Sequence, residues 1–258
     1  MKESVLRTLL VSFLVCLVCS LVVSYSAVSL RDAQEINKLN DKRSKILQAA
    51  GIFDETIPVE EQFTKLEQKF IDFSNGQLLE YIDGLDLSTY DPVEYSKKSG
   101  FSESINSDED IAILKSQELF GKIYILRNED ESINKIILPV RGYGLWGTLF
   151  GFISLGSDLN TIEGLEFYEH KETPGLGGEV DNPNWKKIWK GKKVYDISNM
   201  VGIEVIKGKP VASDKNIAYK VDGLSGATIT SKGVTNMMQY WFGDNGYKSA
   251  LENLNNGS

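Results

Sequence analysis

The most regular apolar pattern in the chain lies near its C-terminal end. Val234, Met237, Met238, Trp241 and Phe242 are spaced as one face of a helix. The ten residues 222–231 before this pattern are rich in glycine and hydroxyl side chains, and they offer three candidate N-caps, namely Thr228, Thr230 and Ser231. A helix start of this kind stabilises a bound phosphate by about 0.3–2 kcal/mol. These ten residues alone fit an anion site and an ordinary capped helix equally well.

A second pattern marks the N-terminus, where residues 9–30 contain no charged side chain. As a helix this segment would be about 33 Å long, which is enough to cross the hydrocarbon core of a bilayer. A cleaved signal peptide is the alternative, because Ser24, Ser26 and Ala27 are small residues near a possible cleavage site. The apolar segment continues beyond them, which favours an uncleaved anchor over 9–30 behind a short leader over 1–8.

Positive charges flank this segment on both sides and do not decide its orientation. The leader has Lys2 and Arg7, whereas five basic residues follow the segment by position 45. A simple count would place the C-terminal side in the cytoplasm. Long domains, however, are translocated largely regardless of their charge.

Periodicity divides the remaining chain into a helical part and a β part. Helical spacing over 33–50 and 59–73 predicts two amphipathic helices, and 75–106 is expected to be a connecting region. Strands are predicted over 122–127, 132–141, 147–156, 165–171, 202–207 and 217–221. Asn182 and Pro183 are expected to start a short helix that runs through Trp189.

The predicted fold class is therefore α+β: an N-terminal transmembrane helix followed by a soluble domain of mainly antiparallel strands with flanking helices. Residues 31–107 form the helical and connecting region, and 108–258 form the main domain.

Composition removes several kinds of chemistry. The net charge of −8 argues against a nucleic-acid partner. Both cysteines, Cys16 and Cys19, lie in the apolar segment, and His170 is the only histidine. Disulfides, zinc ribbons and multi-histidine metal sites are therefore excluded from the main domain, and no metal site is predicted. No arrangement of acid, base and nucleophile suggests a catalytic residue, so redox chemistry would require an organic cofactor.

Two further glycine-rich stretches accompany the turn before the C-terminal helix. Residues 141–147 place Tyr143 and Trp146 among three glycines, and residues 172–178 contain Gly175, Gly177 and Gly178. Each stretch alone is most often a strand bend or a plain turn. Together, the three stretches supply a phosphate anchor, an apolar slot and backbone hydrogen-bond donors, which is what flavin mononucleotide (FMN) needs.

The same stretches carry a family resemblance. Thr228 in Ser225-Gly226-Ala227-Thr228 resembles the flavinylation motif of the FMN-binding domain family. The stretches 172–177 and 144–147 are similar to those of the C subunits of the Na+-translocating NADH:quinone reductases. The resemblance implies that FMN is joined to Thr228 by a phosphoester, which a flavin transferase forms from FAD with the help of a metal ion. It also implies cofactor contacts from Ser225, Gly226, Ala227, Thr173, Gly175, Leu176, Gly177, Leu145 and Trp146.

This resemblance further implies an FMN-carrying electron-transfer subunit of the sodium-pumping NADH:quinone oxidoreductase. Such a chain completes no reaction alone and would contact the other subunits, the flavin transferase and membrane lipid. It would span the bacterial inner membrane once, with a cytoplasmic N-terminus and a periplasmic main domain. The alternatives are the equivalent subunit of the related ferredoxin:NAD oxidoreductase (Rnf) complex and a non-redox, membrane-tethered binding module. We expect His170 to be a solvent-facing strand residue rather than a group that tunes the flavin.

Overall fold

The computed structural model describes residues 5–256. The chain divides into two compact units, residues 1–42 and residues 43–258. Helix α1 (Val5–Ser29) is long and apolar enough to cross a membrane, a test that an N-terminal signal sequence also passes. It is followed by α2 (Arg31–Ala50), which agrees with the predicted helix over 33–50. Residues 1–4 of the expected leader lie outside the described residues.

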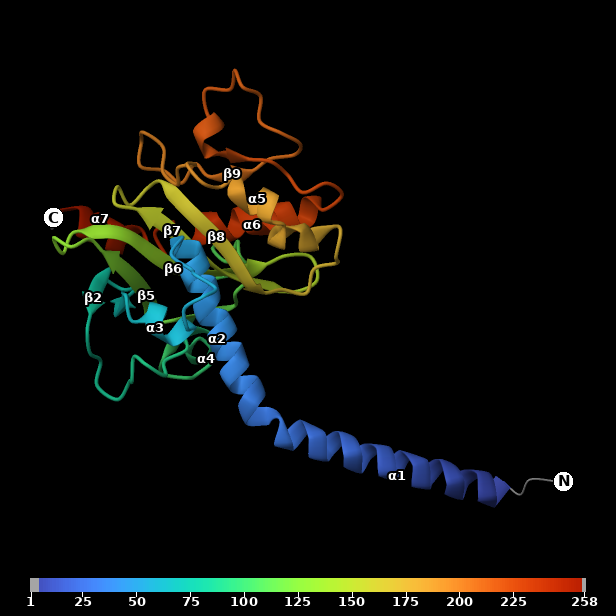
Figure 1. The fold of residues 1–258 in the computed structure, drawn as a ribbon. Helices are drawn as coiled ribbons and strands as arrows, with labels where there is room; N and C mark the ends of the chain where they lie inside the picture. The colour runs from blue at the N-terminus through green and yellow to red at the C-terminus, as the bar shows by residue number, and fades with distance from the viewer. Residues whose placement is uncertain (1–4, 257–258) are drawn as a thin grey trace. The chain divides into compact units, whose positions relative to one another are not determined.

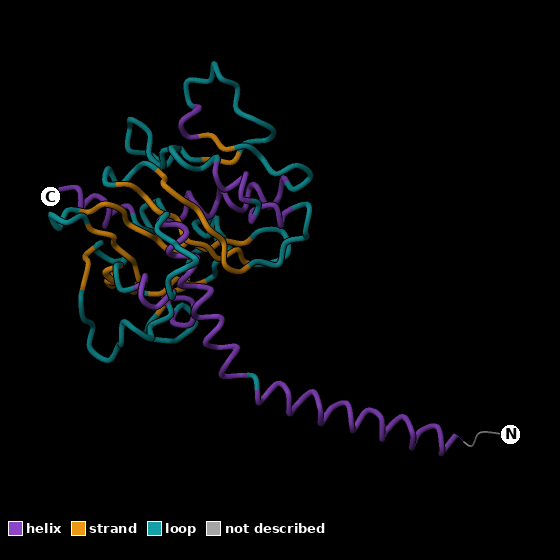
Figure 2. The backbone as a smooth tube through the Cα atoms, viewed as in Figure 1, coloured by secondary structure: helices purple, strands orange, loops and turns teal. Residues whose placement is uncertain are grey.

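A six-stranded antiparallel sheet forms the centre of the second unit (Figures 1 and 2). Its strands are ordered β2-β1-β5-β6-β7-β8. Their bounds are β1 Leu66–Asp72, β2 Gln77–Leu79, β5 Phe120–Arg127, β6 Ile133–Tyr143, β7 Thr148–Gly156 and β8 Ile162–Glu169. The four consecutive strands β5 to β8 match the predicted ones to within three residues at each end. The predicted α+β fold class, with its mainly antiparallel strands, is confirmed.

Side chains alternate between the two faces of this sheet because successive residues of a strand point in opposite directions. On one face, Ile123, Ile136 and Leu138 join the largest apolar cluster. Helices α6 (Thr228–Trp241), α7 (Lys248–Asn256) and α5 (Pro183–Lys187) contribute to this cluster. The other face packs against the last turn of α2 and against α3 (Val59–Phe63).

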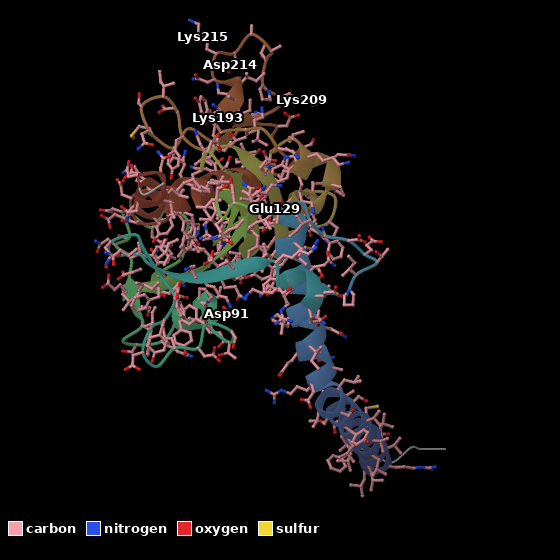
Figure 3. The ribbon with its side chains drawn as sticks, turned by 60° about the vertical axis from the view of Figure 1, so that its left-hand side comes forward. Asp91, Glu129, Lys193, Lys209, Asp214 and Lys215 are labelled. Carbon is pink, nitrogen blue, oxygen red and sulfur yellow. The ribbon has the colours of Figure 1, made fainter. Side chains whose placement is uncertain are left out.

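The shorter elements lie outside the six-stranded sheet. They are α4 Pro92–Tyr95, β3 Ser102–Ser104, β4 Ser116–Glu118, the 3-10 helices η1 Gly177–Asp181 and η2 Ile217–Tyr219, and the parallel pair β9 Glu204–Val205 and β10 Lys220–Val221. The loop between β9 and η2 projects from the domain and carries Lys209, Asp214 and Lys215 (Figure 3). The strands predicted over 202–207 and 217–221 are only two residues long each in the structure.

The helix predicted over 59–73 is wrong. Only Val59–Phe63 is helical, and the following residues form β1 between β2 and β5. Phe63, Leu66 and Phe70 have helical spacing, but the backbone pairing with β5 over seven residues, from Leu66 to Asp72, decides the conformation. The compact unit thus includes β1 and β2, which the sequence pattern assigned to the region before residue 108.

Candidate functional site

Helix α6 begins at Thr228 and carries the predicted apolar pattern, but none of the three candidate hydroxyls caps it. The N-cap residue is Ala227, whose side chain cannot accept a hydrogen bond. Ser231 instead accepts a hydrogen bond from the N–H of Leu224, at 3.0 Å, and so closes the turn before the helix. Within residues 5–256, the N–H groups of Thr228, Ile229 and Thr230 donate to no protein acceptor. Free donors at a helix start favour an anion.

The two threonines of this turn lie in opposite environments. Thr228 is exposed, whereas Thr230 is completely buried. The hydroxyl of Thr230 donates to the carboxylate of Glu172 over 2.5 Å. Thr228 therefore presents the accessible hydroxyl beside the free N–H groups.

Glu172 connects the three glycine-rich stretches, a role that the sequence did not reveal. Its side chain is 5% exposed, and its Oε1 accepts hydrogen bonds from the N–H groups of Leu145 and Trp146, each at 2.9 Å. Its Oε2 accepts the Thr230 hydroxyl. The N–H groups of Leu145 and Trp146 are thus occupied by the carboxylate and are not the donors for a heterocycle.

Backbone donors remain in the loop 172–178. Within that loop, the N–H groups of Leu176 and Gly178 both donate to the carbonyl of Thr173, at 3.1 and 2.9 Å. The N–H groups of Thr173, Gly175 and Gly177 have no hydrogen-bond acceptor among the described residues. Thr173 and Gly175 are exposed, so their N–H groups are free to bind the edge of a polar ring, whereas Gly177 is buried.

Large apolar side chains are exposed on all three stretches. Their exposed fractions are 38% for Tyr143, 41% for Leu145, 63% for Trp146, 45% for Leu176 and 58% for Ile229. Leu176 lies against Gly226, where an added Cβ would be 3.0 Å from its Cδ2. Gly226 also has a φ of +71°, a conformation that favours glycine. Ile229 was not predicted, because it lies outside the quoted Ser-Gly-Ala-Thr motif.

His170 is less exposed than expected and follows β8 directly. Its imidazole is 16% exposed, with Nε2 2.8 Å from the carboxylate of Asp181. Its Nδ1 accepts the N–H of Glu172 at 3.2 Å, so the neutral ring carries its proton on Nε2. The histidine therefore supports the start of the loop 172–178 and does not face solvent freely.

Only the first half of the basic and aromatic stretch 185–190 is helical. Asn182 caps α5 by accepting the N–H of Asn184, and Pro183 occupies the first turn, as predicted. The helix ends at Lys187, two residues earlier than expected, and Trp189 is fully buried.

Among the described residues, no group of three or more histidine, cysteine or acidic side chains could hold a metal ion.

Comparison with known proteins identifies the family of this site. The model of the FMN-binding domain matches residues 144–243, which contain all three glycine-rich stretches from Gly144 onward. The C subunit of the Na(+)-translocating NADH-quinone reductase of Pseudomonas aeruginosa is 42% identical over 99% of this chain and 98% of its own length. The corresponding protein of Yersinia pestis is 36% identical over 100% of this chain and 96% of its own.

This chain belongs to the family of C subunits of the Na(+)-translocating NADH-quinone reductases.

Solved structures of this family agree with the fold. The NqrC structure from Shewanella oneidensis superposes with a TM-score of 0.75 at 28% identity, covering 83% of this chain and 98% of that one. The structure of the C subunit from Parabacteroides distasonis gives a TM-score of 0.64 at 33% identity, covering 86% and 96%. All ten residues predicted to contact the cofactor lie within the segment matched by the FMN-binding domain.

Proposed function

We propose that this chain is the FMN-carrying electron-transfer subunit of a sodium-pumping NADH:quinone oxidoreductase, with FMN attached through its phosphate to the hydroxyl of Thr228. The observation that carries this proposal is the contrast between Thr228, the threonine of the motif, and Thr230, which lies two residues after it. The Thr228 hydroxyl is exposed at the start of α6, while the Thr230 hydroxyl is buried and already bonded to Glu172.

The start of α6 suits a phosphate diester. The free N–H groups of Thr228, Ile229 and Thr230 can donate to phosphate oxygens, and the helix dipole favours their negative charge. Attachment forms a bond between Thr228 Oγ1 and the phosphorus of the FMN moiety of FAD. The bond between the two phosphates of FAD breaks, AMP leaves, and the threonine proton is released with it. We assign the catalysis of this reaction to the flavin transferase that the family resemblance implies.

The residues around Thr228 also fit the flavin ring. Leu145, Trp146 and Leu176 expose apolar surface, and Thr173 and Gly175 keep free N–H groups. An isoalloxazine is a flat aromatic system with a polar edge, so it needs both features. When bound, FMN supplies a redox group that takes up and releases electrons, and the protein holds and orients it. Ser225, Gly226 and Ala227 form the turn that brings Thr228 to the surface.

Similarity to subunits of the complex supports the proposed partners and location. We assign the other subunits of the reductase as the redox partners, the flavin transferase as the maturation partner and membrane lipid as the surroundings of α1. The C subunit from Pseudomonas aeruginosa is 42% identical over 99% of the chain, which favours the quinone reductase over the ferredoxin:NAD oxidoreductase complex. We place the chain in the bacterial inner membrane with its main domain in the periplasm.

Peptide mapping tests the attachment directly. The full chain is produced with a flavin transferase and digested with trypsin, which cleaves after Lys220 and Lys232. The released peptide should be heavier by the mass of FMN less one water, and fragmentation should place the addition on Thr228. An unmodified peptide would refute the covalent attachment.

Co-purification from the native membrane tests the proposed complex. If the tagged chain is recovered without other reductase subunits, the proposed complex is refuted.

A further inference from the structure

The carboxylate of Glu172 lies between the two parts of the site that must hold opposite ends of one ligand. One oxygen accepts the N–H groups of Leu145 and Trp146, and the other accepts the hydroxyl of Thr230. Leu145 and Trp146 expose apolar surface and are called the apolar wall of the site. Thr230 is two residues after Thr228. A single buried side chain therefore joins the wall to the helical turn that carries the attachment point.

Two glycines of the site make room for this carboxylate. A Cβ at Gly144 would be 2.6 Å from Glu172 Oε1, and a Cβ at Gly177 would be 2.4 Å from Oε2. Real Cβ atoms do not approach so closely, so any other residue at either position would displace the carboxylate. These glycines thus serve the internal link, whereas Gly226, with its positive φ, serves the turn.

The next turn of α6 rests on the same wall. A Cβ at Gly233 would be 2.4 Å from the carbonyl oxygen of Tyr143, so the helix backbone lies directly against the backbone before Leu145. Glu172 fastens the first turn of α6, and Gly233 allows the close approach of the second. Glu172 and Gly233 therefore both join the start of α6 to the stretch 143–146.

We infer that Glu172 is a positioning residue of the FMN site, which fixes the spacing between the apolar wall and the Thr228 attachment point so that the attached ring lies against Leu145 and Trp146. The inference rests on the proposed function. Glu172 acts on the flavin indirectly, by positioning Thr230 and the N–H groups of Leu145 and Trp146. It is not itself an attachment point. Its carboxylate accepts three hydrogen bonds, one of them from the first turn of α6.

The test compares Thr230→Val with Thr230→Ser in the full chain, produced with a flavin transferase and purified in detergent. Valine keeps the shape but removes the donor to Oε2, while serine retains it. Thr148→Val is the matched control, because the Thr148 hydroxyl makes no hydrogen bond within the described residues. Visible circular dichroism of the attached flavin reports its orientation. The spectra are recorded well below the melting temperature of each variant.

We expect Thr230→Val to carry flavin on Thr228 but to lose most of the flavin circular dichroism, while Thr230→Ser and Thr148→Val retain it. In the unmodified chain, Glu172→Ala should speed hydrogen exchange of the Leu145 and Trp146 amides by about tenfold or more, because hydrogen bonds to a charged group are lost. Unchanged dichroism in Thr230→Val or unchanged exchange in Glu172→Ala would overturn the inference. A wild-type chain without flavin would refute the proposed function instead, and the exchange measurement would still test the link.

Discussion

Thr228 and Thr230 are two residues apart on α6, and this separation places their hydroxyls on opposite sides of the helix. Two positions correspond to about 200° of rotation, so one side chain faces solvent while the other faces the domain. Thr230 is completely buried against Glu172, and Thr228 is exposed. The start of α6 therefore contains one exposed threonine and one buried threonine.

Replacing Gly177 by alanine should destabilise the site without touching the flavin attachment point. The new Cβ would meet Glu172 Oε2 at 2.4 Å and Thr230 Oγ1 at 2.6 Å, so the free energy of unfolding should fall by about 1–3 kcal/mol. Urea denaturation measures the change. Gly156→Ala is the control, because its Cβ would meet no atom closer than 3.6 Å. Equal stability of the two variants would show that the carboxylate is not held as described.

The buried ion pair between Arg141 and Glu118 should stabilise the fold near the end of β6, just before the apolar wall formed by Leu145 and Trp146. Two hydrogen bonds join the guanidinium to the carboxylate, and the side chains are 9% and 2% exposed. Burial lowers the pKa of Arg141, but the neighbouring Glu118 charge outweighs this effect and raises it, so the guanidinium remains charged. Glu118→Ala should cost about 3–5 kcal/mol of the free energy of unfolding. The double variant Glu118→Leu/Arg141→Met should lose less than Glu118→Ala, and a larger loss would contradict the account.

The turn between β7 and β8 should make stability depend on acid pH. Burial would raise the pKa of Asp158, but hydrogen bonds from the Thr161 hydroxyl and from the Thr161 and Asn160 N–H groups lower it overall. A lowered pKa stabilises the fold above the unfolded value of about 3.9, and this contribution is lost as pH falls below it. Urea denaturation should therefore show wild type more stable than Asp158→Asn at pH 7, with the difference shrinking toward pH 3. A constant difference would refute this assignment.

The orientation of the chain can be tested with one engineered cysteine. Both natural cysteines lie in α1, so Ser107→Cys in a Cys16→Ser/Cys19→Ser background places a single thiol at an exposed position of the main domain. We expect a membrane-impermeant maleimide to label this thiol in intact spheroplasts. Labelling that appears only after lysis would place the domain in the cytoplasm.

The sequence correctly predicted those elements in which the pattern of apolar residues matches the faces that are buried in the fold. Strands β5 to β7 carry continuous runs of buried residues because both faces of the sheet are covered by other elements. Helix α6 shows one apolar face because only one side of it packs on the sheet. The segment 59–73 misled because Phe63, Leu66 and Phe70 fit a helix as well as a strand, and only the pairing with β5 distinguishes the two.

The sequence indicated the three glycine-rich stretches of the candidate site but not the contacts between them. Three glycine-rich stretches pointed to one cofactor, and the fold brings all three together at Glu172. The bond between Glu172 and Thr230 joins residues 58 positions apart, so no local pattern could indicate it. For the same reason, the sequence could not show that the N–H groups of Leu145 and Trp146 are occupied by a carboxylate.

The most direct test of the central claim is in-gel flavin fluorescence after denaturing electrophoresis of chains produced with a flavin transferase. Because Thr228 has the accessible hydroxyl and Thr230 the buried one, we predict a fluorescent band for wild type and Thr230→Ser. Thr228→Ala should give none. A dark wild-type band, or a fluorescent Thr228→Ala band, would contradict the assignment of Thr228 as the residue that carries FMN.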